Sequence, residues 1–384
     1  MTTIKAVLKR GDKTVSVDFP CRENDLLEKL QQIDAESSLL PTIVIDKITM
    51  PTCFGYFEGK RLNLDELNYL AKRMDSFDEK EISRFYEAVM HREDKSLKDL
   101  INLTFNLHKY VLIRDISSPA QVGWDYLLQT EGALPNGDRN DPKYAEVGKD
   151  IIEKGYSVFT EHGLFIYNPF AKLDEVYDGT VFPQYMWSDS LIEAKIDYKG
   201  KAEFVYLPDD EQAIRKAVER LGAESIDECA IGIESADIYD DKMLEIIEKA
   251  INTDGIYAAN DLFRKLSEAS PEYDKLAAMV EFTDAVHCHD IGVLLDHIND
   301  FGFIEGAETH EAVGRFFVEN YDEYQVSMAL EDYINYDGFG EQMAEEHEGE
   351  FISSGFVYYN GSRCLDDILA QFGEPDSTIT MGGM

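Results

Sequence analysis

Two stretches of the chain, 188 residues apart, share one pattern of alternating apolar and polar positions. Residues 6–20 (AVLKRGDKTVSVDFP) alternate around Gly11-Asp12, and residues 194–208 (AKIDYKGKAEFVYLP) alternate around Gly200. Each stretch predicts a β-hairpin that ends in a proline. An amphipathic helix and a short apolar strand are predicted to follow each hairpin, with helices at 22–33 and 209–222 and strands at 42–48 and 229–235.

The same parallel continues into a helical middle region. Predicted helices at 62–74 and 256–269 carry Asn68 and Asn260 at equivalent positions, 192 residues apart. A second pair follows Ser76, which we expect to form a capping box with Glu79, and Ser270. The latter precedes Pro271, a residue suited to a first helical position. The third pair of helices is expected at 96–107 and 290–301.

Each half then closes with a further helix and an aromatic strand pair. The helices begin near Gly123 and Gly314, and the strand pairs lie at 155–167 and 349–360. We therefore predict a tandem duplication with an α+β fold: an elongated, multi-module protein in which small β-hairpin and helix modules flank a helical middle. The expected division is a first copy at 1–167, a packed linker at 168–190, a second copy at 191–363 and a C-terminal tail at 364–384.

Charge distinguishes the two halves. The chain has 76 acidic and 36 basic residues, a net charge of −40, yet 44% of its residues are hydrophobic, which indicates a folded protein. Residues 1–190 hold 32 acidic and 23 basic residues (−9), whereas 191–384 hold 44 and 13 (−31). No Lys or Arg lies between Arg315 and Arg363. Such a chain repels nucleic acid and anionic membranes and attracts basic surfaces, so neither nucleic acid nor a membrane is expected as a partner.

Other sequence features predict a cytoplasmic protein. The chain has no apolar run long enough for a membrane span and no secretory leader, and its five scattered cysteines are expected to be free thiols.

The sequence offers little support for catalysis. His287, Cys288, His289, Asp290 and His297 are the densest group of metal-ligand types, but zinc sites usually use two separated pairs of ligands, so capping or packing roles are favoured. Phosphate-binding, dinucleotide-binding and nucleophile-elbow motifs are absent from the sequence. Paired carboxylates cannot be singled out among so many, although a carboxylate enzyme stays an alternative. No enzyme activity, metal or cofactor is predicted.

Aromatic residues accompany the acidic ones near the C-terminus. They could form a base-stacking platform, but that needs basic partners for phosphates, so packing in the core and hairpin is expected. The residues are Tyr333, Tyr336, Phe339, Phe351, Phe356, Tyr358 and Tyr359. Carboxylates held on such a folded frame could imitate the regular charges of B-form DNA, because the entropy of ordering them is already lost on folding.

Residues 312–359 (AVGRFFVENYDEYQVSMALEDYINYDGFGEQMAEEHEGEFISSGFVYY) resemble the C-terminal third of the ArdA antirestriction proteins of conjugative plasmids and transposons. Residues 66–89 resemble the central region of that family, and the closing region of the first copy resembles the same third. The resemblance implies a curved, acidic, three-module dimer that mimics bent DNA and occupies the DNA-binding groove of type I restriction–modification enzymes.

The resemblance also implies which residues form the DNA-mimic, partner-binding surface. The family's acidic segment corresponds here to Asp322, Glu323, Glu331, Asp332, Asp337, Glu341, Glu345, Glu346, Glu348 and Glu350.

This chain departs from the family in two ways. It contains two units, so it is expected to be a pseudo-dimer within one chain or to pair with another chain as a homodimer. Its first copy also carries Arg139, Lys143, Lys149 and Lys154 where the second is acidic. The alternative to antirestriction is an acidic interaction module for another basic or DNA-binding host protein.

Overall fold

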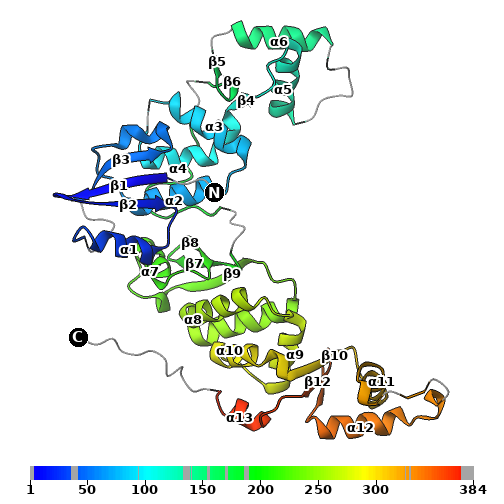
Figure 1. Ribbon diagram of the computed structural model, residues 1–384. Helices are drawn as coiled ribbons and strands as arrows, with labels where there is room; N and C mark the ends of the chain where they lie inside the picture. Colours follow the sequence, from blue (N-terminus) through cyan, green and yellow to red (C-terminus); the bar gives the residue numbers. More distant parts are fainter. Residues whose placement is uncertain are drawn as a thin grey trace. The chain divides into compact units, whose positions relative to one another are not determined.

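The computed structural model describes residues 4–35, 42–93, 95–132, 139, 141–153, 156–168, 172–185, 190–324, 326–327 and 330–372. The chain divides into two compact units by its internal contacts. The first unit comprises Met1–Ser188 with Tyr198–Phe204 and Gln212–Glu228, and the second comprises Asp189–Asp197, Val205–Glu211 and Cys229–Met384. Its secondary structure is α+β, as predicted (Figure 1).

The first copy opens with a small antiparallel sheet. Its elements are β1 (Ile4–Arg10), β2 (Lys13–Phe19), α1 (Glu23–Gln31) and β3 (Val44–Met50), and the strand order is β2-β1-β3. The predicted alternation is confirmed in β1, where Ile4, Ala6 and Leu8 are buried. This pattern places one face of the hairpin against the core.

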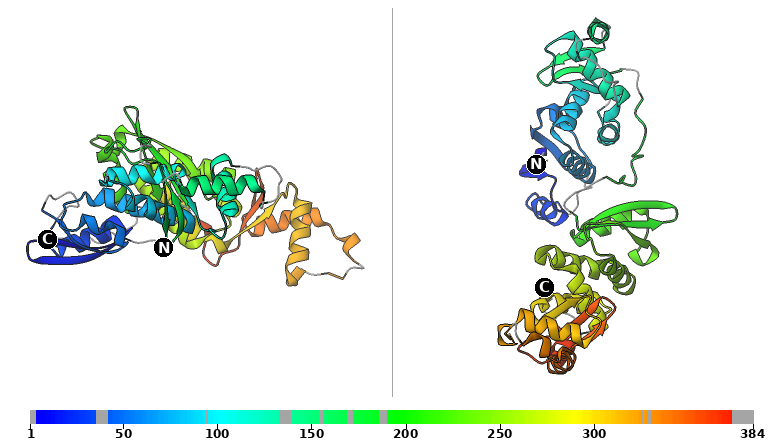
Figure 2. Two further views of the ribbon diagram at one scale, coloured as in Figure 1. Left: turned by 90° about the horizontal axis from the view of Figure 1, so that it is seen from above. Right: turned by 90° about the vertical axis from the view of Figure 1, so that its right-hand side faces the viewer.

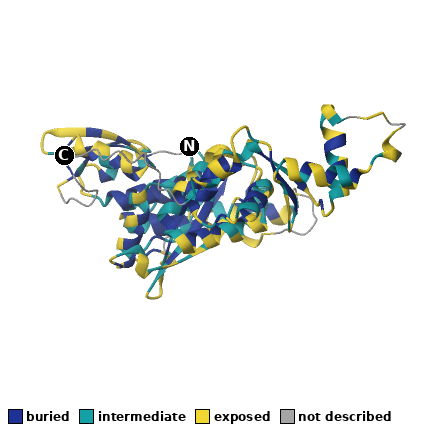
Figure 3. Ribbon diagram, turned by 90° about the horizontal axis from the view of Figure 1, so that it is seen from below, coloured by how far each residue is buried: buried dark blue, intermediate teal, exposed yellow. Residues whose placement is uncertain are grey.

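The helical middle of the first copy follows. It consists of η1 (Thr52–Phe57), α2 (Leu64–Asp75), α3 (Glu79–Met90), α4 (Leu97–Phe105) and η2 (Leu107–Lys109). Buried positions in these helices are interleaved with partly buried ones, and α2 and α4 have no exposed residue. Figure 3 colours the chain by burial and shows dark blue buried positions interleaved with intermediate and exposed ones along its helices. Their apolar stripes bury against one another, which is the usual source of helix stability in a globular protein.

A closing module at residues 111–168 completes the first copy. Its elements are β4 (Val111–Ile113), α5 (Pro119–Glu131), α6 (Pro142–Glu153), β5 (Ser157–Thr160) and β6 (Gly163–Ile166), with strand order β4-β6-β5. We call it the first closing module.

The second copy repeats this order of elements. It contains β7 (Ile192–Tyr198), β8 (Lys201–Leu207), α7 (Glu211–Leu221), η3 (Ile226–Glu228), β9 (Ala230–Ala236), α8 (Asp241–Ala269), α9 (Tyr273–Thr283), α10 (Cys288–Asp296), η4 (Ile298–Asp300), β10 (Phe301–Glu305), α11 (His310–Asn320), η5 (Asp322–Tyr324), η6 (Glu331–Tyr333), α12 (Tyr336–Glu346), β11 (Glu350–Ile352) and β12 (Gly355–Tyr359). Its strand orders, β8-β7-β9 and β10-β12-β11, match those of the first copy element for element. The second closing module is residues 301–360.

Asparagine side chains make the same backbone contacts in both copies. The Asn68 amide accepts from Cys21 N–H at 3.0 Å and donates to Cys21 O at 2.9 Å. Asn260 makes the equivalent pair with Asp209, at 2.9 and 2.8 Å. Each clamped residue directly follows the proline that ends the hairpin. The predicted asparagine repeat is therefore a repeated junction between strand, helix and middle region.

The described part of the predicted linker packs against the first copy. Tyr177, Phe182 and Tyr185 are buried, and the Tyr69 ring stacks on Phe182 with centroids 4.3 Å apart. Asn102 anchors the backbone, because its Oδ1 accepts from Tyr177 N–H at 2.8 Å. In the right-hand view of Figure 2 this green segment runs beside the blue and cyan helices. These three aromatic side chains thus extend the core of the first unit, whereas most other residues of 172–185 are exposed.

Two predicted helix starts are wrong. The capping box of α3 uses Asp78 and Glu81, because Ser76 is instead the C-cap residue of α2. Ser270 likewise ends α8 in the left-handed conformation, and α9 begins later, at Tyr273.

Two further differences concern α8 and the predicted tail. Helix α8 is interrupted at Gly255 (φ 83°): the part after this break coincides with the predicted helix at 256–269, and the part before it, from Asp241, was not predicted. The predicted tail at 364–384 begins with the unpredicted helix α13 (Leu365–Leu369), and residues 373–384 lie outside the described part. No described helix combines the length and the apolar character that crossing a membrane requires.

Candidate functional site: an acidic face on the second closing module

Glycines let the two helices of the second closing module approach closely. A Cβ atom added at Gly340 would lie 2.6 Å from the carbonyl carbon of His310 and 2.8 Å from Gly314 N. The first copy repeats this crossing, since a Cβ at Gly148 would lie 2.8 Å from the carbonyl carbon of Pro119. Only glycine allows backbones this close, so both modules have the same rigid helix pair.

The second closing module also has an aromatic core. Phe317, Phe356 and Tyr358 are buried together with Met343, and the hydroxyl groups of Tyr321 and Tyr358 lie 2.7 Å apart. Such buried rings contribute large apolar areas and fix the frame on which surface side chains are displayed.

The predicted packing role of the aromatic residues is confirmed for most of them. Tyr336, Phe356, Tyr358 and Tyr359 are buried, and Phe339 is partly buried against the core.

Tyr333 and Phe351 depart from that prediction. Phe351 is 39% exposed, although its ring contacts those of His310 and Phe356. The prediction is wrong for Tyr333, which lies on the short helix η6 and is 85% exposed. Sequence reasoning missed this exposed ring, since nothing in its local pattern separates it from the buried tyrosines.

Nine of the ten predicted partner-binding residues have described side chains, and all nine are exposed. They are Asp322, Glu323, Glu331, Asp337, Glu341, Glu345, Glu346, Glu348 and Glu350, which we call the acidic face. The tenth, Asp332, lies outside the described side chains. The residues are therefore displayed and take no part in the core.

The acidic face follows α12. Asp337, Glu341 and Glu345 are spaced by four residues, so they form one stripe with a carboxylate about every 6 Å along the helix axis. Glu323, on η5, and Glu346, near the end of α12, both contribute to raising the pKa of Tyr324, after burial of its hydroxyl. The structure thus brings η5 and the end of α12 together around this tyrosine.

Few cations oppose these charges. Residues 301–360 contain 14 acidic side chains and Arg315 alone among Lys and Arg, a net −13. Arg315 bonds to Glu311 at 2.8 Å and lies 4.2 Å from the centroid of the Tyr336 ring. Among the described residues, this arginine therefore neutralises a carboxylate outside the acidic face.

The first closing module has the same frame with a different surface. Residues 111–168 hold nine acidic and five basic residues, a net −4. On α6 the positions matching the α12 stripe are Ala145, Lys149 and Glu153. Of the predicted basic residues, Lys143 and Lys149 are exposed on this module.

The remaining basic residues of the first closing module differ in their surroundings. Arg139 is exposed and lies 5.4 Å from the centroid of the Trp124 ring, whereas Lys154 lies outside the described residues. A strongly acidic surface is therefore not required by this fold.

The charges on α12 oppose helix stability. Like charges four residues apart destabilise a helix by about 0.2–0.5 kcal/mol per pair. Glu345 and Glu346 also lie at the C-terminal end of α12, where the helix dipole favours cations. The acidic stripe of Asp337, Glu341 and Glu345 therefore lowers the stability of α12. A destabilising feature of this kind favours a role in binding a partner.

The histidine and cysteine group has ordinary structural contacts. Asp254 lies 2.7 Å from His287 Nδ1 and accepts from Cys288 N–H, and His297 pairs with Asp300. His289 contacts the carbonyl of Gln371 instead. Within the described part of the chain, no three His, Cys, Asp or Glu side chains gather as metal ligands would.

Two described carboxyl groups have a raised pKa. Burial raises the pKa of Glu66, which lines a cavity of about 970 Å³ with Tyr56, Lys60 and Arg92. Burial also raises the pKa of Glu203, to about 7, but Glu203 is not among the residues that line this cavity. The two carboxyl groups with a raised pKa therefore do not line this cavity together.

The sequence was compared with protein-family models and with curated proteins. The sequence matches no protein-family model, and it has no significant match among curated proteins.

Proposed function

We propose that this protein is an acidic DNA mimic that occupies the DNA-binding groove of a type I restriction–modification enzyme and performs no chemistry. The observation that carries the proposal is the acidic face: nine exposed carboxylates on a glycine-crossed frame whose counterpart in the first copy is much less acidic. The resemblance to ArdA proteins supplies the class of target.

Physical chemistry supports this mode of binding. A groove that binds DNA is lined with Lys and Arg, and it meets one phosphate of each strand about every 3.4 Å along the DNA helix axis. The stripe on α12, with a carboxylate about every 6 Å, offers a sparser row of charges, and the exposed acids of η5 and β11 add to it. Opposite potentials also increase the rate of encounter, and salt weakens them.

The proposal is tested by inhibition of a purified type I restriction enzyme on unmodified DNA. Wild-type protein should inhibit cleavage, and its inhibition constant should increase steeply as salt is raised. A variant with Glu341, Glu345, Glu346, Glu348 and Glu350 changed to Gln should inhibit at least tenfold less.

The control variant changes the net charge equally on the first copy. It replaces the exposed Glu131, Glu146, Glu153, Glu161 and Asp150 with Gln or Asn. This control should inhibit as well as wild type. Equal loss in both variants would indicate only a response to net charge, and full inhibition by the first variant would contradict the mimic mechanism.

An acidic module for another basic host protein is the second candidate. The exposed ring of Tyr333, two residues after Glu331, favours this alternative, because aromatic rings often anchor an interface in a pocket of a protein partner. Capture from a host lysate distinguishes the two: methyltransferase and specificity subunits support antirestriction, whereas one other DNA-binding protein supports the alternative.

A further inference from the structure

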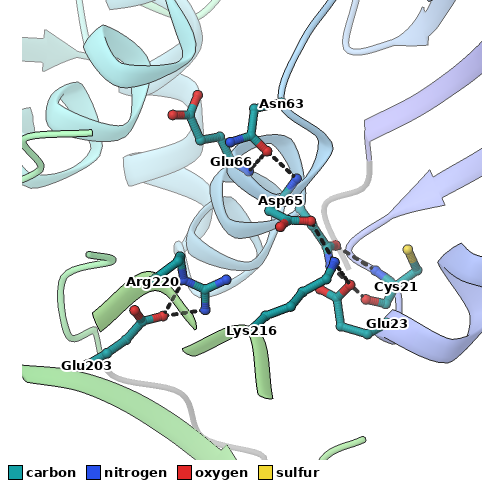
Figure 4. Close-up of polar contacts among 9 residues, drawn as sticks. Cys21, Glu23, Asn63, Asp65, Glu66, Glu203, Lys216 and Arg220 are labelled. Atoms are coloured by element: carbon teal, nitrogen blue, oxygen red, sulfur yellow. Dashed lines mark hydrogen bonds and ion pairs between the residues drawn. The ribbon is translucent and has the colours of Figure 1, made fainter. Parts of the chain in front are cut away.

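The first unit contains a helix from the second copy. Helix α7 carries Lys216, whose Nζ lies 2.6 Å from Glu23 of α1 and 2.7 Å from Asp65 of α2. Figure 4 shows the lysine reaching between these two carboxylates. Both acids are only 8% exposed, so this is a buried ionic cluster.

A second contact lies one helical turn further along α7. Arg220 donates to Glu203 through two nitrogens (Figure 4). Its guanidinium also lies 4.6 Å from the centroid of the Phe182 ring. Phe182 belongs to the linker between the copies (the connecting segment, residues 172–185) and stacks on Tyr69 of α2. One face of α7 therefore contacts both the first copy and the segment that follows it.

The buried cluster depends on all three of its members. Burial alone lowers the pKa of Lys216, but the charges of Glu23 and Asp65 outweigh this effect and raise it. Removing one partner of such a group leaves an uncompensated buried charge, which is strongly destabilising.

Comparison of the copies shows that this contact has no reciprocal version. At the 188-residue shift of the opening modules, Lys216 corresponds to Glu28 and Glu23 to Glu211. At the 192-residue shift of the middle regions, Asp65 corresponds to Tyr257. A helix of the first copy in place of α7 would thus bring a third carboxylate to Glu23 and Asp65.

We propose that the α1–α2 face of the first copy is a docking surface specific for α7 of the second copy in the same chain. The charges favour pairing of the second copy with the first. Pairing of two first copies would be unfavourable, because Glu28 would then lie against Glu23 and Asp65. Pairing of two second copies would lack the ionic cluster, because Glu211 and Tyr257 stand in place of Glu23 and Asp65. This proposal is independent of the function of the acidic face.

Charge exchange in the full-length protein tests the pairing. Lys216→Glu should lower the first unfolding transition by about 10 °C, because it puts a third acid into the cluster. Adding Glu23→Lys to Lys216→Glu should recover most of that loss. The matched control is Arg215→Glu, which makes the same charge change on an exposed side of α7 and should shift Tm by only a few degrees.

These variants give a decisive result even if the single one does not fold. A Lys216→Glu variant as stable as the Arg215→Glu control would overturn the proposal. So would a double variant that is no better than the single one, or that fails to fold.

A mixing experiment separates docking within one chain from exchange between chains. One preparation carries Lys216→Glu and the other carries Glu23→Lys. If α7 docks within its own chain, the mixture should keep both low transitions and show no new dimer by mass photometry. Recovery of stability with a mixed dimer would contradict docking within one chain.

Discussion

Replacement of Gly340 by alanine tests whether the helix crossing supports the acidic face. The added methyl group would lie 2.6 Å from the carbonyl carbon of His310 and 2.8 Å from Gly314 N, where ordinary contacts lie at 3.4–4 Å. These neighbours are backbone atoms and cannot rotate away, so α11 and α12 must move apart.

The cost of this change follows from two opposing effects. Overpacking of this kind costs about 3 kcal/mol, and the better helix propensity of alanine returns about 1 kcal/mol. The net loss of about 2 kcal/mol corresponds to local opening that is about 30-fold more frequent.

Hydrogen exchange measured by mass spectrometry reports this opening. Buried amides of α12 should exchange about 30-fold faster in the Gly340→Ala variant, and inhibition by the acidic face should weaken with them. Protection of α12 equal to that of wild type would refute the reasoning.

Two control variants separate the possible causes. Gly292→Ala, inside α10, meets nothing closer than Lys265 Nζ at 3.5 Å, so it should stabilise its helix by up to about 1 kcal/mol. Gly148→Ala makes the same backbone clash in the first copy and should loosen α6 while leaving inhibition unchanged.

Three further predictions concern charge, contact and pH. Changing Glu341 and Glu345 to Gln should raise the stability of α12 by about 1 kcal/mol in urea unfolding while weakening inhibition, because it removes like-charge pairs; a loss of stability would contradict this account. Tyr333→Ala should leave Tm unchanged, since the ring is 85% exposed, but should weaken partner binding about tenfold by calorimetry. Burial raises the pKa of Glu203 to about 7 despite Arg220, so the folded state keeps a proton that the unfolded state releases above about pH 4.5. Stability of the first unit should therefore fall by up to about 3 kcal/mol as pH rises from 4.5 through 7, and Tm measured at pH 5 and 8 should differ less in Glu203→Gln.

The repeat could be predicted because its markers are local. Asn68 and Asn260 each begin an Asn-x-Leu pattern, and Gly123 and Gly314 each follow a valine within the same kind of helix. Side chains with special backbone roles recur at fixed spacing, so they reveal a duplicated fold without any contact being known.

Features that depend on distant contacts could not be predicted. Lys216 meets Glu23 across 193 residues of sequence, and a surface lysine on an amphipathic helix has the same local pattern. Tyr333 shares its aromatic character with buried residues such as Tyr336 and Tyr358, so its exposure has no local signal in the sequence. The helix starts were misplaced because serine, aspartate and glutamate occur close together before α3, and several of them can cap.

The packing of the connecting segment limits how this gene can evolve. Tyr177 and Phe182 complete the first unit's core, although they lie beyond the first repeat of the sequence. A deletion that removed everything after residue 167 would expose the apolar surface of α2 and α4, and it would leave the charges of Glu23 and Asp65 without their lysine. Return to a single copy by recombination would therefore yield a damaged protein, so the duplication is selectively difficult to reverse.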